Sequence, residues 1–458
     1  MTRHPALLAA FALLALVPPA RADDMMEFVS QYRPSFATHW LDVHLVGNRA
    51  LVPGASGLSV FDITTPNAPV FLGRYQQPLG GIQFYHATPS TPLTYTAARD
   101  NGIFVLNVAN APPTLVATHD EGTRSFEGLL LDGTLLYVAT HDDGLRIYNV
   151  SNPSNLTLTG SLGGFANAWA VDKQGSTVVV ADAEGGLKVV DVSNPAAPAL
   201  LATAATSGAA QDVVWKGNEA YVACGGNGVD IFDLTTPAAP VLRGNYATDS
   251  SAFLLAADPA AARVYVATWD IVDVIDVGDP AHPVRAGFED TPTRAMGVAA
   301  SATHVFVADW DTFRVYRFGP TTQPDLSVTP SILSFPAVPI GQSADSTVTI
   351  ANTGGATLNV TNIVTGNAEF HVAPSTFQVP PGGQVDVTLT VTPIAAKGYG
   401  NLRVACNDPD ENGLDHLIDY GTVGTVAIDF TLNDLNGSPY TLSSHRGEII
   451  LMAFFASW

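Results

Sequence analysis

The chain has 458 residues, of which 47% are hydrophobic and 14% charged. This length exceeds what one ordinary core supports and predicts two or three domains. The 20 basic and 42 acidic residues give a formal net charge of −22, which argues against nucleic acid and anionic lipid as partners.

The first 22 residues resemble an export signal. Arg3 supplies a positive start, residues 6–17 form an apolar run, and Ala20-Arg21-Ala22 matches a cleavage site of the A-x-A type. The run is shorter than the roughly 20 residues that cross a bilayer, and no later stretch is long enough. We therefore expect cleavage after Ala22, no membrane span, and a secreted or periplasmic chain.

A repeat organises residues 23–320. Six predicted strands end in Asp or Asn and continue into a turn that contains Pro; the closing residues are Asp62, Asn107, Asn149, Asp191, Asp233 and Asp276. Their spacings are 45, 42, 42, 42 and 43 residues, and a seventh unit begins at Phe313. Each period holds about four predicted strands, the content of one propeller blade. We expect the closing side chains to bond backbone N–H groups two residues on, which is a structural role.

The last unit lacks its final strand. Residues 27–34 resemble the outer strand at residues 71–78, so we expect the N-terminal strand to complete a seventh blade and leave no open edge. Six blades plus a stray unit is the alternative. The segments resemble LVIVD repeats, a bacterial secreted propeller family, and the resemblance implies a fold and a location but no established reaction.

Residues 321–425 have a different pattern, with short alternating strands and Gly or Pro at the turns. About seven such strands in roughly 100 residues predict an immunoglobulin-like sandwich. The stretches TVTIANTGGATL and PPGGQVDVTLTVTP resemble the ASPM/Hydin-type domain, also named choice-of-anchor D. That resemblance implies a spacer or interaction module.

One stretch of this domain is close to a calcium loop. Asp408, Asp410, Asn412 and Asp419 follow the spacing D-x-D-x-N-G-x5-D, although the last position is normally Glu. No helical pattern flanks the stretch, as an EF-hand requires, and a plain turn before the last strand accounts for the same residues. Calcium is the one cofactor that the sequence suggests.

Residues 426–458 resemble the start of a thioredoxin-like domain of the AhpC/TSA–redoxin type. The matching pieces, in order, are Asp429-Phe430, Asn436-Gly437, Arg446-Gly447 and the run FFASW that ends at Trp458, with Glu448 where Lys is common. In that family the nucleophilic Cys follows this run, so the resemblance implies a truncated fragment without its catalytic residue. A UGA codon for selenocysteine read as a stop would produce this end; a frameshift, a nonsense mutation or a fragment boundary are the alternatives.

The two cysteines do not replace that nucleophile. Cys224 and Cys406 fall in different predicted domains and outside any C-x-x-C motif. We expect each to be a small buried hydrophobic residue rather than half of a disulfide.

The blade turns supply candidate binding residues, since acids and aromatics recur there. They are His141, Asp142, Asp143, Asp182, Glu184, Trp269, Asp270, Asp309, Trp310 and Asp311. Together they suggest a surface for a cation, glycan or protein, while hairpin-turn chemistry accounts for any one of them. The histidines, which include His39, His44, His86, His119, His141, His282 and His304, show no ligand spacing, and no hydrolase, metalloprotease or nucleotide-binding motif is present.

The sequence therefore predicts an all-β chain: a seven-bladed β-propeller, an immunoglobulin-like β-sandwich and a truncated thioredoxin-like fragment. The expected function is that of a secreted or periplasmic interaction scaffold, not an enzyme in this form, whose propeller binds an unknown protein or glycan. The alternative is the truncated product of an exported thiol- or selenol-dependent oxidoreductase whose nucleophile would follow Trp458.

Overall fold

The structure is a computed structural model that describes residues 26–36, 39–55, 57–76, 82–122, 124–319, 322–330, 333–335, 338–409, 412–413, 415–421, 431–433 and 439–441. Apart from two short segments, the chain divides into a unit that ends at Asp325 and a unit that begins at Leu326. All regular elements in the described ranges are strands, which confirms the all-β class. None of the described residues forms a helix that could cross a membrane. The predicted export signal lies outside these ranges.

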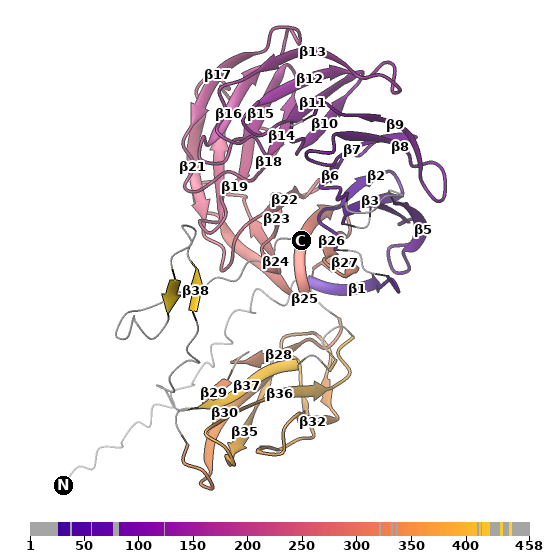
Figure 1. The fold of residues 1–458 in the computed structure, drawn as a ribbon. Coiled ribbons are helices and arrows are strands. Elements are labelled where there is room, and N and C mark those ends of the chain that lie inside the picture. Colours follow the sequence, from indigo (N-terminus) through magenta and orange to yellow (C-terminus); the bar gives the residue numbers. More distant parts are fainter. Residues whose placement is uncertain are drawn as a thin grey trace, which may run out of the picture. The chain divides into compact units, whose positions relative to one another are not determined.

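The first unit is a ring of antiparallel sheets that follow one another along the chain (Figure 1). Within residues 44–246 each sheet has four strands in sequence order. These strands are β2 (His44–Val46), β3 (Arg49–Gly54), β4 (Gly57–Asp62), β5 (Val70–Tyr75); β6 (His86–Ala87), β7 (Leu93–Ala97), β8 (Ile103–Asn107), β9 (Thr114–His119); β10 (Leu129–Asp132), β11 (Leu135–Ala139), β12 (Leu145–Asn149), β13 (Thr157–Leu162); β14 (Ala170–Gln174), β15 (Thr177–Ala181), β16 (Leu187–Asp191), β17 (Ala199–Ala204); β18 (Asp212–Lys216), β19 (Glu219–Ala223), β20 (Val229–Asp233) and β21 (Val241–Tyr246).

A seven-stranded sheet completes the ring, in the order β1-β27-β26-β25-β24-β23-β22. Its strands are β1 (Met26–Tyr32), β22 (Leu254–Ala257), β23 (Arg263–Ala267), β24 (Trp269–Asp276), β25 (Val284–Ala300), β26 (Val305–Asp309) and β27 (Thr312–Phe318). Strand β25 is long because residues 284–290 pair with β24 and residues 295–300 pair with β26. Strand β1 pairs with β27, from Met26 opposite Phe318 to Tyr32 opposite Phe313, which is the closing pairing that the sequence predicted.

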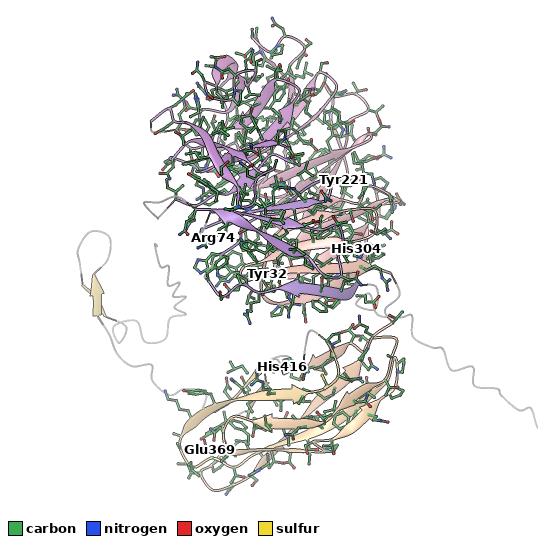
Figure 2. All side chains as sticks on the ribbon, turned by 90° about the vertical axis from the view of Figure 1, so that its right-hand side faces the viewer. Tyr32, Arg74, Tyr221, His304, Glu369 and His416 are labelled. Atoms are coloured by element: carbon green, nitrogen blue, oxygen red, sulfur yellow. The ribbon has the colours of Figure 1, made fainter. Side chains whose placement is uncertain are left out.

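Aromatic contacts join the two ends of the ring. The rings of Phe61 in β4 and Phe313 in β27 are stacked with centroids 4.4 Å apart, and both side chains are fully buried. Tyr32, labelled in Figure 2, lies 5.3 Å from the ring of Phe71 in β5. The first and last sheets therefore share one apolar cluster.

The two middle strands of each four-stranded sheet are buried on both faces because neighbouring sheets cover them. Val178 and Val180 of β15 pack with Ile147 of the preceding sheet. Val179, which points the other way, packs with Val222 of the following sheet. This double burial explains the continuous β-branched runs in the repeats.

The Asp or Asn that closes each repeat makes the turn contact that the sequence predicted. Asp62 accepts the backbone N–H of Thr64 at 2.8 Å, and Asp191 accepts that of Ser193 at 2.8 Å. The same contact, two residues on, is made by Asn107, Asn149, Asp233 and Asp276. These side chains hold the corner between strands.

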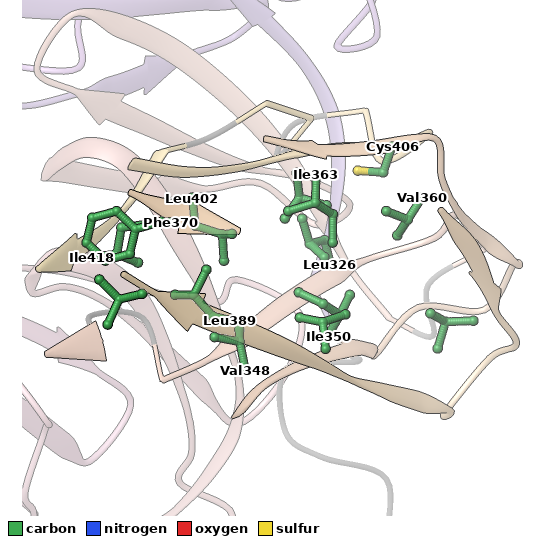
Figure 3. Close-up of a cluster of buried hydrophobic side chains, with 14 of the residues drawn as sticks. Leu326, Val348, Ile350, Val360, Ile363, Phe370, Leu389, Leu402, Cys406 and Ile418 are labelled. Carbon is green, nitrogen blue, oxygen red and sulfur yellow. The ribbon is translucent and has the colours of Figure 1, made fainter. Parts of the chain in front are cut away.

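The second unit is a two-sheet sandwich, as predicted. One sheet has the order β28-β30-β35-β33 and the other β29-β37-β36-β32, with a separate β31-β34 pair. The strands are β28 (Leu326–Thr329), β29 (Leu333–Phe335), β30 (Ala344–Asn352), β31 (Leu358–Val360), β32 (Asn362–Thr365), β33 (Phe370–Ala373), β34 (Phe377–Val379), β35 (Gln384–Val391), β36 (Lys397–Ala405) and β37 (Asp415–Gly421). Figure 3 shows the core between the sheets, where Ile350, Leu389, Leu402 and Phe370 are buried.

Cys224 and Cys406 are both buried and form no disulfide, as expected. Cys406 packs in the sandwich core (Figure 3). Beyond the sandwich, β38 (Thr431–Asn433) pairs with β39 (Pro439–Thr441). Most of the predicted redoxin start at 426–458 lies outside the described residues, so that likeness stays a prediction.

Candidate binding channel

The inner strands of the ring surround two adjoining cavities. The larger has a volume of about 430 Å³ and is lined partly by turn residues such as Arg99 and Trp269; we call it the mouth cavity. The smaller, of about 360 Å³, is the inner cavity. Asp42, His86 and Asp212 line both, so the two are parts of one channel.

The strands that line the cavities, here called the inner strands, are β2, β6, β10, β14, β18, β22 and the last part of β25. One residue within each inner strand, or up to three positions ahead of it, lines the mouth cavity. These residues are Leu41, Tyr85, Glu127, Trp169, Gln211, Phe253 and Met296. In four cases the residue immediately before the lining residue forms an isolated β-bridge with a turn of the preceding sheet. Phe126, for example, bridges to Arg99, and Ala168 bridges to His141. The repeat therefore brings the same position of each unit to one cavity.

A second set of large side chains comes from turn positions with positive φ. Arg99, His141, Trp269 and Trp310 have φ of 49°, 45°, 80° and 42°, whereas one repeat has Gly225 there, with φ of 58°. A non-glycine residue in this conformation costs about 1 kcal/mol. Ala183 occupies the same position in a further repeat, with φ of 36°, so the turn accepts residues other than glycine of different sizes.

Arg99 and Glu127 both line the mouth cavity and contact each other. The Arg99 guanidinium carbon lies 3.8 Å from the centroid of Tyr85 and 5.5 Å from that of Trp169. Its Nε donates to Glu127 Oε2 at 3.2 Å, and His141 Nε2 lies 3.0 Å from Glu127 Oε1. The buried carboxylate thus accepts a hydrogen bond from Arg99 and lies within ion-pair distance of His141, which comes from the next turn.

Arg294 organises a second aromatic group. Its guanidinium carbon lies 4.7 Å from the centroid of Trp269 and 5.3 Å from that of Trp310. Phe253 lies 5.3 Å from Trp269, and His39 stacks on Trp310 at 4.7 Å. The face therefore combines Arg with aromatic rings, which are enriched at protein interfaces.

The sequence-predicted turn residues divide into two groups. Trp269 and Trp310 meet at Arg294, and His141 lies beside Glu127. Glu184 lines the mouth cavity. Asp142, Asp143 and Asp270 are exposed and Asp311 is half-buried, with Asp143 paired to Arg124 at 2.8 Å.

Two of the predicted acids do not face the mouth. Asp309 is fully buried and accepts the Thr293 hydroxyl and the Arg294 N–H, at 2.8 and 2.6 Å. Asp182 is also fully buried and accepts two backbone N–H groups, the nearer from Asn167 at 2.8 Å. Both hold turns, so their inclusion in the predicted binding surface was wrong.

Sequence reasoning missed Arg99, Tyr85, Glu127 and Trp169. Arg99 begins the turn RDNG at the position where His141 begins HDDG, and this alignment would have identified it. The other three stand just ahead of inner strands, where only the ring geometry shows that they converge.

Asp42, His44 and His86 form a cluster in the channel wall. His44 Nε2 lies 2.7 Å from Asp42 Oδ2, and the two imidazole centroids are 4.2 Å apart. Burial and the neighbouring His44 lower the pKa of His86 to about 3, although Asp42 opposes the shift. The sequence shows no ligand spacing among the histidines, but His44 and His86 are 42 positions apart, about one repeat, and the ring brings them together on adjacent inner strands.

Two further carboxylates line the inner cavity. Asp172 accepts the backbone N–H of Trp215, and Asp212 that of Leu255, each at 2.7 Å. Burial raises the pKa of Asp172 and raises that of Asp212 to about 7. The channel wall is therefore rich in acidic groups.

The predicted calcium residues are only partly described. Asp408 is buried, Asn412 Oδ1 accepts the Cys406 N–H at 3.1 Å, and Asp419 lies in β37 opposite Tyr399. Asp410 lies outside the described residues. The Asn412 contact is a turn contact, and calcium binding stays a prediction.

Comparisons with known proteins agree with this architecture. The LVIVD repeat model matches residues 125–163, 167–206, 207–248 and 264–291, and the HYDIN/CFA65/VesB-like Ig-like domain model matches residues 324–414. No curated protein matches the chain in sequence.

Among solved structures, the β-propeller domain of Cps50 (Swd1) from Myceliophteria thermophila is similar, with a TM-score of 0.53 and 10% identity over 64% of this chain and 99% of that one. The computationally designed Ika8 protein has a TM-score of 0.48 and 15% identity over 64% of this chain and 100% of its own. The chain thus contains LVIVD repeats in a β-propeller, followed by a HYDIN/CFA65/VesB-like Ig-like domain.

Proposed function

We propose that this chain is a non-enzymatic, exported interaction scaffold whose propeller binds a protein partner at the mouth cavity. The observation that carries the proposal is a pair of Arg–aromatic groups, Arg99 with Tyr85 and Trp169, and Arg294 with Trp269 and Trp310. The first group lines the mouth cavity, and the second reaches it through Trp269. Arg, Trp and Tyr dominate the binding energy of protein interfaces. The Arg294 guanidinium lies over one face of Trp269 and one face of Trp310. Because a sugar ring would have to stack on such a face, this arrangement favours a protein partner over a glycan.

The propeller proposed here has seven blades. The sixth would consist of β22, β23, β24 and the first part of β25, and the seventh of the last part of β25 with β26, β27 and β1. The pairing of β25 with both β24 and β26 supports this division. Export rests on the predicted signal, and mass spectrometry of the exported protein should find Asp23 as its first residue.

Affinity capture with matched variants tests the function. The full chain is immobilised and exposed to extracytoplasmic proteins of the source cells, beside Trp269→Ala and the control Tyr399→Ala, whose side chain is 76% exposed on the sandwich. We expect wild type and the control to retain the same protein and Trp269→Ala to lose it. Equal retention by all three chains, or retention of no protein, would refute the proposal.

A further inference from the structure

We propose that Asp42, His44 and His86 bind a divalent first-row transition metal ion such as Zn²⁺ in the wall of the channel. This inference is independent of the proposed protein partner. The ligand atoms of the three side chains all lie within 4.8 Å of one another, and no other such group of three is found among the described residues. Ligands around a zinc ion lie about 3.4 Å apart in a tetrahedral site, so small side-chain rotations would complete the set.

The two imidazoles have nitrogen atoms that lack hydrogen-bond partners. Within the described part of the chain, buried His44 Nε2 and His86 Nδ1 make no hydrogen bond of acceptable geometry, although Asp42 Oδ2 is close to the first. A buried polar atom left unsatisfied is unfavourable. A metal ion would satisfy both nitrogens and the carboxylate at once.

The carboxylate is already oriented for this role. Asp42 Oδ1 accepts the backbone N–H of Val43 at 2.7 Å, which leaves Oδ2 directed toward His44. Such contacts to the atoms behind a ligand fix its direction and strengthen metal binding. The two histidines come from the adjacent inner strands β2 and β6, so the fold of the ring sets their separation.

The surroundings favour a cation and leave room for further ligands. Asp42 and His86 line both cavities, and Asp172 and Asp212 line the inner one. Carboxylates and a chain charge of −22 attract cations. Imidazole nitrogen favours zinc and its neighbours over calcium or magnesium, and three protein ligands leave a position open to the channel.

Metal titration of the untagged full chain tests the proposal. The protein is first treated with a chelator and then titrated with ZnCl₂ by calorimetry at pH 7.5, with bound zinc counted by mass spectrometry after dialysis. Wild type should bind one ion per chain at the cluster. Asp42→Asn and His86→Phe should each weaken binding about tenfold or more.

A matched control separates the cluster from ordinary His–carboxylate pairs. His282 lies 2.9 Å from Asp279 in such a pair, but its side chain is 83% exposed, and no third ligand residue joins the pair among the residues that the structure describes. His282→Ala should bind zinc as wild type does. Absence of zinc binding by wild type, unchanged binding by both cluster variants, or a loss in His282→Ala would overturn the proposal. If His86→Phe does not fold by circular dichroism, Asp42→Asn decides, since its side-chain oxygen can still accept the Val43 N–H.

Discussion

The carboxylate of Asp212 accepts the backbone N–H of Leu255 at 2.7 Å and so joins the inner strand β18 to the next inner strand β22. Asp172 makes the same kind of bond to Trp215, from β14 to β18. The inner strands of three successive sheets are thus linked by carboxylates that face the channel. Their ionisation should influence the stability of the ring.

The stability of the chain should depend on pH through Asp212. Burial raises the pKa of this carboxyl to about 7 from its usual 3.8, so its stabilising contribution is full below about pH 4 and is lost as the pH rises through about 7. Asp212→Asn does not titrate. In urea unfolding with a chelator present, the advantage of wild type over Asp212→Asn should therefore decrease between pH 5 and pH 8.

An aspartate at a blade turn, outside the channel, provides the control for this profile. The hydrogen bond from the backbone N–H of Ser193 lowers the pKa of Asp191, which ends β16, and keeps that carboxyl ionised over the same range. Wild type and Asp191→Asn should differ by a constant amount from pH 5 to pH 8. A flat profile for Asp212→Asn would contradict the assignment.

Glycine should be better tolerated than alanine at Trp269. The backbone there has φ of 80°, and the equivalent position of another repeat is Gly225. Both substitutions remove the indole, but only alanine keeps the strain of an L residue at positive φ. Trp269→Gly should be more stable than Trp269→Ala by about 1 kcal/mol in urea unfolding; the reverse order would show that the turn is not strained.

Phe61 and Phe313 should be energetically coupled. Each is fully buried, and substitution of either by alanine should lower the free energy of unfolding by about 3–5 kcal/mol. Because the rings stack at 4.4 Å, a double-mutant cycle should give a coupling of about 0.5–1.5 kcal/mol. Phe61 and Phe126 belong to different clusters, so their alanine substitutions should have additive effects on the free energy of unfolding. Equal coupling energies in both pairs would argue against a specific contact between Phe61 and Phe313 at the ring closure.

Two glycines near the end of β13 should respond differently to alanine. A Cβ on Gly160 would lie 2.2 Å from the carbonyl oxygen of Pro195 in the next sheet, whereas one on Gly163 would meet nothing within 4 Å. Gly160→Ala should lower the unfolding free energy by about 1–3 kcal/mol through overpacking. Gly163→Ala should leave the midpoint of thermal unfolding nearly unchanged, and if Gly160→Ala is tolerated equally well, the two sheets are not packed so closely.

The sequence predicted those features that depend on local chemistry or on repetition. The turn contacts of Asp62 and Asp191 follow from an Asx side chain two residues before an N–H group, and the role of β1 follows from its likeness to an outer strand. The convergence of His44 with His86 depends on the alignment of two adjacent inner strands, which spacing along a single strand does not reveal. In sequence Asp309 resembles the exposed turn aspartates Asp142 and Asp270, and only the packing of the turn shows that it is buried.

The pairing of β1 with β27 has a consequence for how the protein folds. Met26 finds Phe318 only after almost the entire propeller has been synthesised, and contacts of such high sequence separation form slowly. The closing of the circle is therefore a late kinetic step, and until then β27 presents an open edge to other chains. A chain that crosses a membrane before it folds would meet this risk on the far side, where the speed of ring closure would decide between a closed monomer and aggregation.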